Sequence, residues 1–152
     1  MASINTNADT SIAGEYLTFG LGAELYCVAT AQVREILDVL PITPMPRTPR
    51  YVKGVIGFRG ETVFVIDARV KFGMPERESA PGTSIILVGA GGKSAGLLID
   101  TVKGVIVGKV QIGPPPCFGA GAGNAFVIGL VKFGDPVKLL DIDRMLEDLK
   151  LS

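Results

Sequence analysis

Short runs of β-branched and aromatic residues, separated by turns rich in glycine and proline, recur along this chain. The clearest example is residues 51–73, in which two such runs, 52–56 and 62–66, flank the turn GFRG at 57–60. β-branched residues favour strands, and glycine relieves the steric limits of a sharp reversal. Because the runs are short and do not alternate with long helices, the pattern predicts a mainly β protein built from small antiparallel barrels.

Further strand signals lie on both sides of this stretch. The runs 15–21 and 25–29 are separated by a short turn and predict a hairpin. The runs 84–88 and 94–99, around a glycine-rich turn, predict a second hairpin. More strands are expected at three places, which are 102–107, 126–131 and 137–140.

Two segments have helical features. Thr30 is a candidate N-cap, and Val33 and Ile36 are three residues apart, which predicts one or two helical turns over 30–36. Near the C-terminus, apolar residues recur at helical spacing behind Asp141, which is a suitable N-cap. These apolar residues are Ile142, Met145, Leu146 and Leu149. We therefore expect a C-terminal α-helix that packs onto a barrel.

Residues 41–50 lie between the first helical segment and the central hairpin and contain four prolines. Proline has no amide hydrogen, so this segment is expected to form an extended arm without ladder hydrogen bonds. Two short words occur twice, VKGVI at 52–56 and 102–106 and VKFG at 70–73 and 131–134. We give them little weight as a sign of duplication, because such short words arise easily by chance.

Composition limits the class of partner. The 15 Lys and Arg residues balance 15 Asp and Glu residues, which argues against a strongly basic nucleic-acid binder, and 47% hydrophobic residues argue against disorder. The first 14 residues contain no Lys or Arg and no apolar core, which indicates a flexible tail over 1–13 rather than a secretory signal. The uncharged stretch 110–131 contains three adjacent prolines and several glycines, so it predicts a loop rather than a membrane-spanning helix. We expect a cytoplasmic protein with no direct membrane insertion.

No motif for catalysis or cofactor binding is intact, and the chain has no histidine. The word GGKS at 91–94 resembles the end of a phosphate-binding loop. It joins two predicted strands rather than opening a helix, so a hairpin turn is the better interpretation. Gly119 and Gly121 begin a GxGxxG pattern, but Asn124 stands where the last glycine would be required.

The remaining thiol and acidic groups have structural interpretations. Cys27 and Cys117 lack metal-ligand spacing and are expected to be buried or half-buried free thiols. Four aspartates stand at strand or helix ends, where capping or solvation explains them better than metal binding. They are Asp67, Asp100, Asp141 and Asp143. Taken alone, Glu35 and Arg59 would be two unrelated solvated charges.

Several words taken together resemble the CheW family of bacterial chemotaxis coupling proteins. They are VREI at 33–36, RTPRYVKGVIGFRG at 47–60, VIDARVKFG at 65–73, GLLIDTVKGVI at 96–106 and IGL at 128–130. The resemblance implies a CheW-like domain over residues 14–152, with two small intertwined β-barrels, a short helix near 30–36 and a C-terminal α-helix. It also implies a scaffold that is not an enzyme and needs no cofactor.

By this resemblance the chain would link the cytoplasmic tips of chemoreceptors, the methyl-accepting chemotaxis proteins, to the regulatory domain of a CheA-type histidine kinase. It would then be found at membrane-associated receptor arrays. The receptor tip, an amphipathic helix, would dock in a groove between the barrels, and a partly buried pair of Glu35 and Arg59 would fix its geometry. The matching groove positions are Val33, Glu35, Ile36, Gly54, Arg59, Ser84, Gly96, Val102, Val105 and Gly129.

Four features depart from the family pattern. The usual Asn-Leu-Arg-Gly turn is GFRG here, Phe64 replaces a common proline, Ala68 replaces a leucine, and Ser84 occupies an apolar groove position. One alternative is the coupling protein of a related chemosensory system that controls type IV pili or gliding. An alternative from another class is a small-ligand-binding β-barrel or a divergent enzyme that uses Asp67 or Cys27. The absence of histidine argues against this second alternative.

Overall fold

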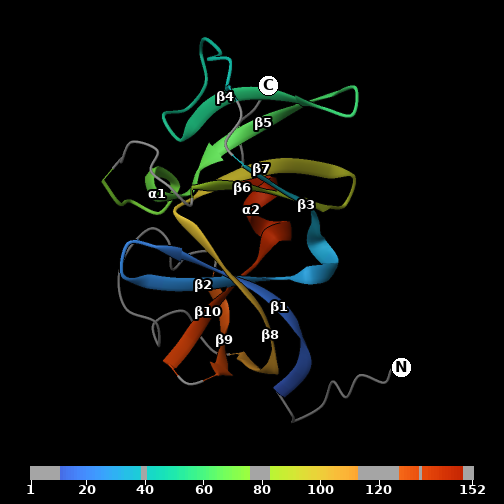
Figure 1. Ribbon diagram of the computed structural model, residues 1–152, viewed down its shortest axis with the longest axis vertical. Coiled ribbons are helices and arrows are strands. Elements are labelled where there is room, and N and C mark those ends of the chain that lie inside the picture. Colours follow the sequence, from blue (N-terminus) through green and yellow to red (C-terminus); the bar gives the residue numbers. More distant parts are fainter. Residues whose placement is uncertain (1–10, 39–40, 76–82, 113–126, 134, 149–152) are drawn as a thin grey trace.

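The computed structural model describes residues 11–38, 41–75, 83–112, 127–133 and 135–148. Strands dominate it, as the sequence predicts, and the helical elements are short (Figure 1). In chain order the elements are β1 (Ser11–Leu21), β2 (Glu24–Ala29), the 3₁₀ turn η1 (Thr30–Gln32), β3 (Val33–Asp38), β4 (Val52–Phe58), β5 (Glu61–Asp67), α1 (Ala68–Lys71), β6 (Ser84–Ala90), β7 (Lys93–Ile99), β8 (Thr101–Ile112), β9 (Val127–Phe133), β10 (Asp135–Leu140) and α2 (Ile142–Asp148). No helix in these described residues is long and apolar enough to cross a membrane.

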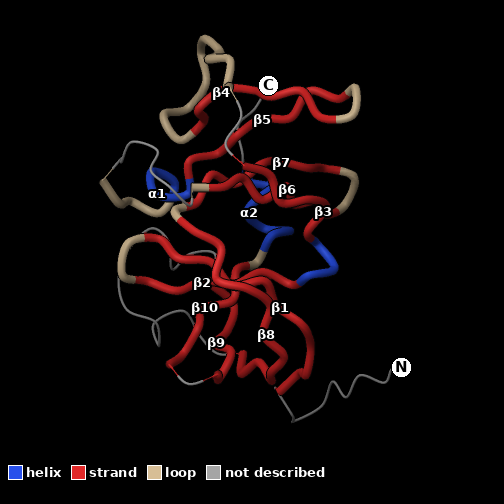
Figure 2. Tube along the Cα trace, in the orientation of Figure 1, coloured by secondary structure: helices blue, strands red, loops and turns tan. Residues whose placement is uncertain are grey.

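The strands form two five-stranded units that are interleaved along the chain (Figure 2). The first is a closed barrel in the order β1-β2-β10-β9-β8, and the second is a sheet in the order β3-β6-β7-β5-β4. Starting from β8 in the first unit and from β3 in the second, successive neighbours pair antiparallel, antiparallel, parallel and antiparallel in both. The chain begins in the barrel, builds the whole second unit, and returns to complete the barrel. The two predicted intertwined β units are therefore confirmed.

The second unit encloses an apolar interior of its own, although its sheet is not closed by backbone pairing. One hydrophobic cluster contains side chains from all five of its strands. These include Leu37 of β3, Ile56 of β4, Val65 of β5, Leu87 of β6 and Leu98 of β7. Because five strands contribute to one core, the unit is wrapped like a barrel with a gap between its two edge strands, β3 and β4.

A larger core joins the two units. It contains Leu17 and Phe19 of β1, Ile86 of β6, and Met145 and Leu146 of α2. Helix α2 lies against β6 and β7, between these strands and the barrel (Figure 1). The amide of Arg144 donates to the Asp141 carboxylate at 3.0 Å, which is the predicted N-cap. The C-terminal helix and its apolar face are thus confirmed, while Leu149 lies outside the described residues.

The predicted hairpins are present, and their turns are tighter than expected. Phe58 pairs with Glu61, so only Arg59 and Gly60 form the central turn. Both have positive φ, 51° and 80°, as type I′ turns require. The β6–β7 hairpin turns in the same way at Gly91 and Gly92, with φ of 60° and 82°. GGKS therefore lies at a hairpin turn, as its sequence predicts.

The helical prediction for 30–36 is correct only for its first three residues. Thr30–Gln32 forms a 3₁₀ turn, whereas Val33–Asp38 is strand β3, paired with β6. The half-buried and exposed residues alternate along β3, which is the two-residue period of a strand edge. The spacing of Val33 and Ile36 was compatible with a helix, but pairing with the neighbouring strand decides the outcome.

Two other segments also differ from expectation, the N-terminal residues 11–13 and the proline-rich arm. The sequence predicts a flexible tail over 1–13, but residues 11–13 belong to β1 and pair with 109–111 of β8. The proline-rich arm is not free of ladder bonds, because Thr43 exchanges both backbone hydrogen bonds with Val55, at 2.9 and 2.8 Å. This approach depends on Gly54, whose φ is 147° and where a Cβ would lie 2.1 Å from the carbonyl oxygen of Thr43.

The repeated words do not mark equivalent positions. VKFG forms the end of α1 in its first copy, while the described part of its second copy, 131–133, is in strand β9. The VKGVI words lie in β4 and β8, which have different neighbours in the two units. In both, the glycine has positive φ and the ladder shifts register beside it. The shared word therefore specifies a local bulge rather than a duplicated unit.

Candidate functional site

Exposed apolar side chains occur on strand β3 of the second unit and on strand β8 of the barrel. Among the described residues, four large hydrophobic side chains are exposed, and three of them are on β3 and β8. They are Ile36, 43% exposed, Val105, 57%, and Val107, 66%. Val105 and Val107 are two residues apart on one strand, so they face the same side. We call β3 and the outer face of β8 the β3–β8 surface.

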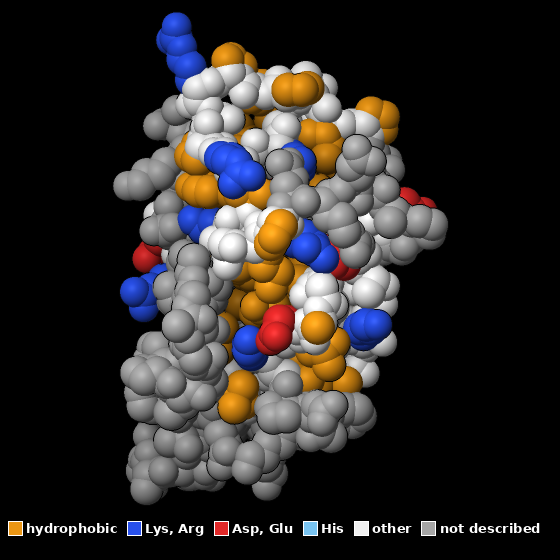
Figure 3. All heavy atoms as spheres, turned by 90° about the vertical axis from the view of Figure 1, so that its left-hand side faces the viewer, with side chains coloured by type: hydrophobic (Ala, Val, Ile, Leu, Met, Phe, Trp, Pro, Cys, Tyr) orange, Lys and Arg blue, Asp and Glu red, His pale blue; other side chains and the backbone are white. Residues whose placement is uncertain are grey.

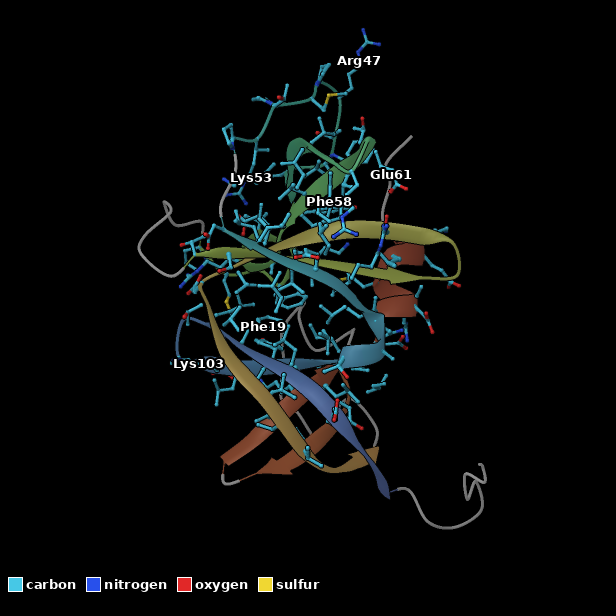
Figure 4. All side chains as sticks on the ribbon, turned by 45° about the vertical axis from the view of Figure 1, so that its right-hand side comes forward. Phe19, Arg47, Lys53, Phe58, Glu61 and Lys103 are labelled. Atoms are coloured by element: carbon cyan, nitrogen blue, oxygen red, sulfur yellow. The ribbon has the colours of Figure 1, made fainter. Side chains whose placement is uncertain are left out.

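The two strands are connected through β1. The Thr30 hydroxyl, just before β3, donates to the Glu15 carboxylate on β1 at 3.5 Å, and Glu15 pairs with Val107 of β8. Val33 and Val102 both pack against the core that joins the units. Figure 4 shows β3 crossing the molecule above the β1–β8 pair. The apolar core between the units therefore continues outward into the β3–β8 surface.

The predicted pairing of Glu35 with Arg59 is present on the second unit. Glu35 Oε1 lies 3.7 Å from Arg59 Nη2, which is an ion-pair distance rather than a hydrogen bond. The Glu35 side chain is 39% exposed and that of Arg59 is 76% exposed. Arg59 is more exposed than expected because it occupies a two-residue turn with φ of 51°, beyond the end of the strands. Its guanidinium lies 4.9 Å from the ring centre of Phe58, the residue just before the turn.

A second ion pair lies beside the first and was not predicted. Arg34 Nη1 is 3.6 Å from Glu61 Oε1, with both side chains exposed. Arg34 precedes Glu35 on β3, and Glu61 follows the Arg59–Gly60 turn, near Phe58 (Figure 4). The two pairs have opposite polarity and both join β3 to the β4–β5 hairpin. The sequence signal was the alternation of charge within the words VREI and FRGE.

Four of the predicted groove positions contribute to shape rather than to an exposed side chain. Gly54 is covered by Thr43, and a Cβ at Gly96 would lie 2.8 Å from Ile85 Cγ2. Gly129 is buried in β9, and Ser84, at the start of β6, is half-buried and pairs with the backbone of β3 and β7. The structure therefore does not bring all ten positions onto one face. Val33, Glu35, Ile36, Arg59, Val102 and Val105 retain at least partly accessible side chains.

The best-formed ion pair in the described residues lies elsewhere, at the joint between the units. Arg69 of α1 binds Asp100 in a bidentate manner, with Nε to Oδ1 at 2.8 Å and Nη2 to Oδ2 at 2.6 Å. The Gly22 amide, in the β1–β2 turn, donates to the same Oδ2 at 2.7 Å. The Arg69 and Asp100 side chains are only 14% and 12% exposed. The hydrogen bond to Asp100 raises the pKa of Arg69 above its usual value, with nearby carboxylates adding to the effect.

This joint corrects the interpretation of Asp100 as a capping or solvated residue. Asp100 instead connects the second unit, through Arg69, to the barrel, through Gly22. The joint lies on the side of α1 and the β1–β2 turn (Figure 1), which is the side that faces the viewer in Figure 3. Both residues stand within the quoted words VIDARVKFG and GLLIDTVKGVI, but nothing in the sequence indicated that they pair.

Asp67 and Cys27, the residues of the enzyme alternative, have roles in the fold. One Asp67 carboxylate oxygen accepts from the Val70 amide at 3.3 Å and caps α1, and the other lies 3.6 Å from Lys53 Nζ. Cys27 is a free thiol buried inside the barrel, as predicted, and burial raises its pKa to about 12. A thiol with so high a pKa is a poor nucleophile at neutral pH. In the described segments, no three His, Cys, Asp or Glu residues gather as metal ligands, and Cys117 lies outside those segments.

Comparison with known proteins agrees with this architecture. Residues 15–150 match the family model described as CheW-like domain. The chain belongs to this family. The "Chemotaxis protein CheW" of Klebsiella aerogenes is 30% identical, covering 100% of this chain and 93% of that protein. The "Chemotaxis protein CheW" of Rhizobium meliloti is 32% identical, covering 85% of this chain and 84% of the relative.

Two further relatives extend the comparison. "Protein FrzA" of Myxococcus xanthus is 31% identical over 88% of this chain and 85% of its own length. A crystal structure, described as that of the scaffolding protein TtCheW from Thermoanaerobacter tengcongensis, superposes with a TM-score of 0.74 at 32% identity. It covers 85% of this chain and 89% of the other. The CheW-like fold thus includes both units described above.

Proposed function

We propose that this protein is a non-enzymatic scaffold that couples chemoreceptors to a CheA-type histidine kinase in chemotaxis. The observation that carries the proposal is membership of the CheW-like domain family over residues 15–150, with relatives named as chemotaxis proteins. The crystallised neighbour is itself described as a scaffolding protein. Through these partners the protein would be held in the cytoplasm at membrane-associated receptor arrays.

The β3–β8 surface is the proposed site for the receptor's helical tip. An amphipathic helix needs an apolar strip, which Val33, Ile36, Val102 and Val105 can provide. The exposed Glu35–Arg59 pair supplies charges of both signs at the β3 side of this surface, which favours one orientation of a docked helix. Gly54, Gly96 and Gly129, together with Ser84, are proposed to maintain the backbone beneath it.

Co-sedimentation with receptor-bearing membranes tests this proposal. Wild-type protein is expected to sediment with the membranes and to increase kinase recruitment. The Arg59→Ala variant should bind receptor more weakly. Lys138→Ala is the matched control, because it also removes a cation from an ion pair, with Glu24, but lies on strand β10 of the barrel, away from β3 and β8. Equal binding by both variants would show that the receptor does not bind at this surface. Absence of wild-type binding would reject the coupling role.

A scaffold must also hold both partners at once. We propose that the kinase regulatory domain binds a surface separate from the β3–β8 surface. Titration calorimetry with the kinase domain, repeated in the presence of saturating receptor-tip fragment, should give the same number of sites. Complete displacement of the kinase domain by the receptor fragment would show one shared site and contradict the scaffold.

The alternative within the family is the same coupling role in a system that controls type IV pili or gliding. The relative "Protein FrzA", which has a different name from the chemotaxis proteins at similar identity, is the observation that favours testing it. A deletion strain separates the two roles. Loss of chemotactic spreading with normal surface movement supports the main proposal, and the reverse supports the alternative.

A further inference from the structure

Four charged side chains meet where β3 faces the β4–β5 hairpin. Arg34 and Glu35 are adjacent on β3, while Arg59 and Glu61 are separated by Gly60 at the hairpin turn. The observed pairs are Arg34 with Glu61, at 3.6 Å, and Glu35 with Arg59, at 3.7 Å. Each arginine is therefore paired across the gap with one carboxylate and lies within two residues of the other carboxylate along the chain. Two pairings of these four side chains are therefore conceivable, and the structure shows one of them.

The neighbourhood of Arg34 favours the observed choice. A Cβ on Gly89 would lie 3.2 Å from Arg34 Cδ, so the missing side chain leaves room for the aliphatic part of Arg34. Arg34 and Glu61 also line the same hollow, together with Gly89 and Lys93. Arg59, in contrast, rests on the ring of Phe58 and extends toward Glu35. Packing thus places Arg34 beside Glu61. Because the Glu61 carboxylate is already paired with Arg34, Glu35 is left as the partner of Arg59.

We propose that Arg34 and Glu61 are positioning residues that keep Arg59 paired with Glu35. This inference deepens the proposed function and rests on it for its effect on receptor binding. When Arg34 loses its charge, Glu61 becomes free to attract Arg59, which is only two residues away in the chain. Glu35 then loses its partner, and the charges that orient the docked helix are displaced. Arg34 and Glu61 act through Arg59 and Glu35 rather than by contacting the receptor.

The partner choice is tested first without any receptor, by NMR of the Arg59 Nε–H resonance, assigned with Arg59→Lys. In the otherwise wild-type chain, Glu35→Gln should shift this resonance and Glu61→Gln should leave it nearly unchanged. In an Arg34→Gln background the pattern should reverse. If Glu61→Gln shifts the resonance equally in both backgrounds, Arg34 does not select the partner and the inference is wrong.

Receptor affinity provides the second measurement. Arg34→Gln should weaken binding of a receptor-tip fragment about 2- to 5-fold, as expected for exposed ion pairs. Adding Glu61→Gln should restore the affinity, because the competing carboxylate is gone. Lys138→Gln is the matched control, since it removes a cation from the Lys138–Glu24 pair on the barrel and should not change affinity. The differences should disappear near 1 M salt, where the screening length is about 3 Å.

These two measurements separate the inference from the function on which it rests. If the wild-type chain does not bind the receptor fragment, the proposed function fails, while the NMR measurement still decides whether Arg34 selects the partner. If Arg34→Gln weakens binding but the added Glu61→Gln gives no recovery, Arg34 contacts the receptor itself and the positioning role is rejected.

Discussion

Removing the Asp100 carboxylate is the most informative single perturbation of the fold. In Asp100→Ala, the Arg69 guanidinium loses both of its short hydrogen bonds, at 2.8 and 2.6 Å, and the Gly22 amide loses its acceptor. Arg69 would then be a largely covered cation without its main partner, since its side chain is 14% exposed. Breaking a buried pair in this way costs about 3 to 5 kcal/mol, and the residual exposure lowers our expectation to about 2 to 4 kcal/mol. For a chain of this size that is a decrease in melting temperature of roughly 6 to 12 °C.

Urea denaturation followed by circular dichroism measures this cost, with Glu24→Ala as the control. Glu24 pairs with Lys138 at 2.7 Å and its side chain is 48% exposed, so its loss should cost less than about 1 kcal/mol. Asp100→Asn should fall between the two, because an amide oxygen can still accept from Gly22. The hydrogen bond to Asp100 raises the pKa of Arg69 in the folded protein. The stability that this bond contributes is fully present below the ordinary arginine pKa and is lost only as pH rises through the higher folded-state pKa. Its charge therefore adds no pH dependence near neutrality. A cost for Asp100→Ala no greater than that for Glu24→Ala would refute the role of this joint.

Three further predictions concern the interior. The Thr18 hydroxyl is buried and has no hydrogen-bond partner among the described residues, so Thr18→Val should raise the free energy of unfolding by about 1 to 3 kcal/mol, and a lower melting temperature would contradict this. Leu146→Ala should cost about 2 to 5 kcal/mol, because this α2 side chain is in the core between the units, while receptor affinity of the folded protein stays the same; unchanged melting with lost binding would instead place α2 in an interface. Burial raises the Cys27 pKa from 9.0 to about 12, so the unfolded chain loses this proton first and stability should fall between pH 9 and 12, by at most about 1.4 kcal/mol per unit. In a Cys117→Ser background, Cys27→Ala should remove that part of the alkaline loss, and an identical pH profile would show that the thiol does not contribute.

Local patterns in the sequence were sufficient for most individual elements. The alternation over 15–21, the glycines at 91–92 and the helical spacing behind Asp141 each depend on interactions within a few residues, and each prediction is confirmed. The same local reasoning failed for 33–36. Two β-branched residues three apart suit either a helix or a strand, and the pairing of β3 with β6, about 50 residues later in the chain, decides between them.

The resemblance in the sequence also predicted that Glu35 and Arg59 pair, and this pair is present. Its degree of exposure was not predictable, because it depends on a two-residue turn that carries Arg59 beyond the strand ends. The Arg34–Glu61 pair lies in the same two segments, yet nothing in the chain specifies which arginine approaches which carboxylate. That choice depends on the space over Gly89 and on the ring of Phe58.

The sequence by itself determined that this chain forms short strands, tight turns and a C-terminal helix, because those follow from side-chain periodicity and from glycine and proline backbone preferences. Only the tertiary structure decided the order of strands in two interleaved units and the joint between them. Asp100 is 31 residues from Arg69 and 78 from Gly22 along the chain. These three groups meet because β7 delivers Asp100 to the gap between α1 and the β1–β2 turn, and no local pattern encodes that arrangement.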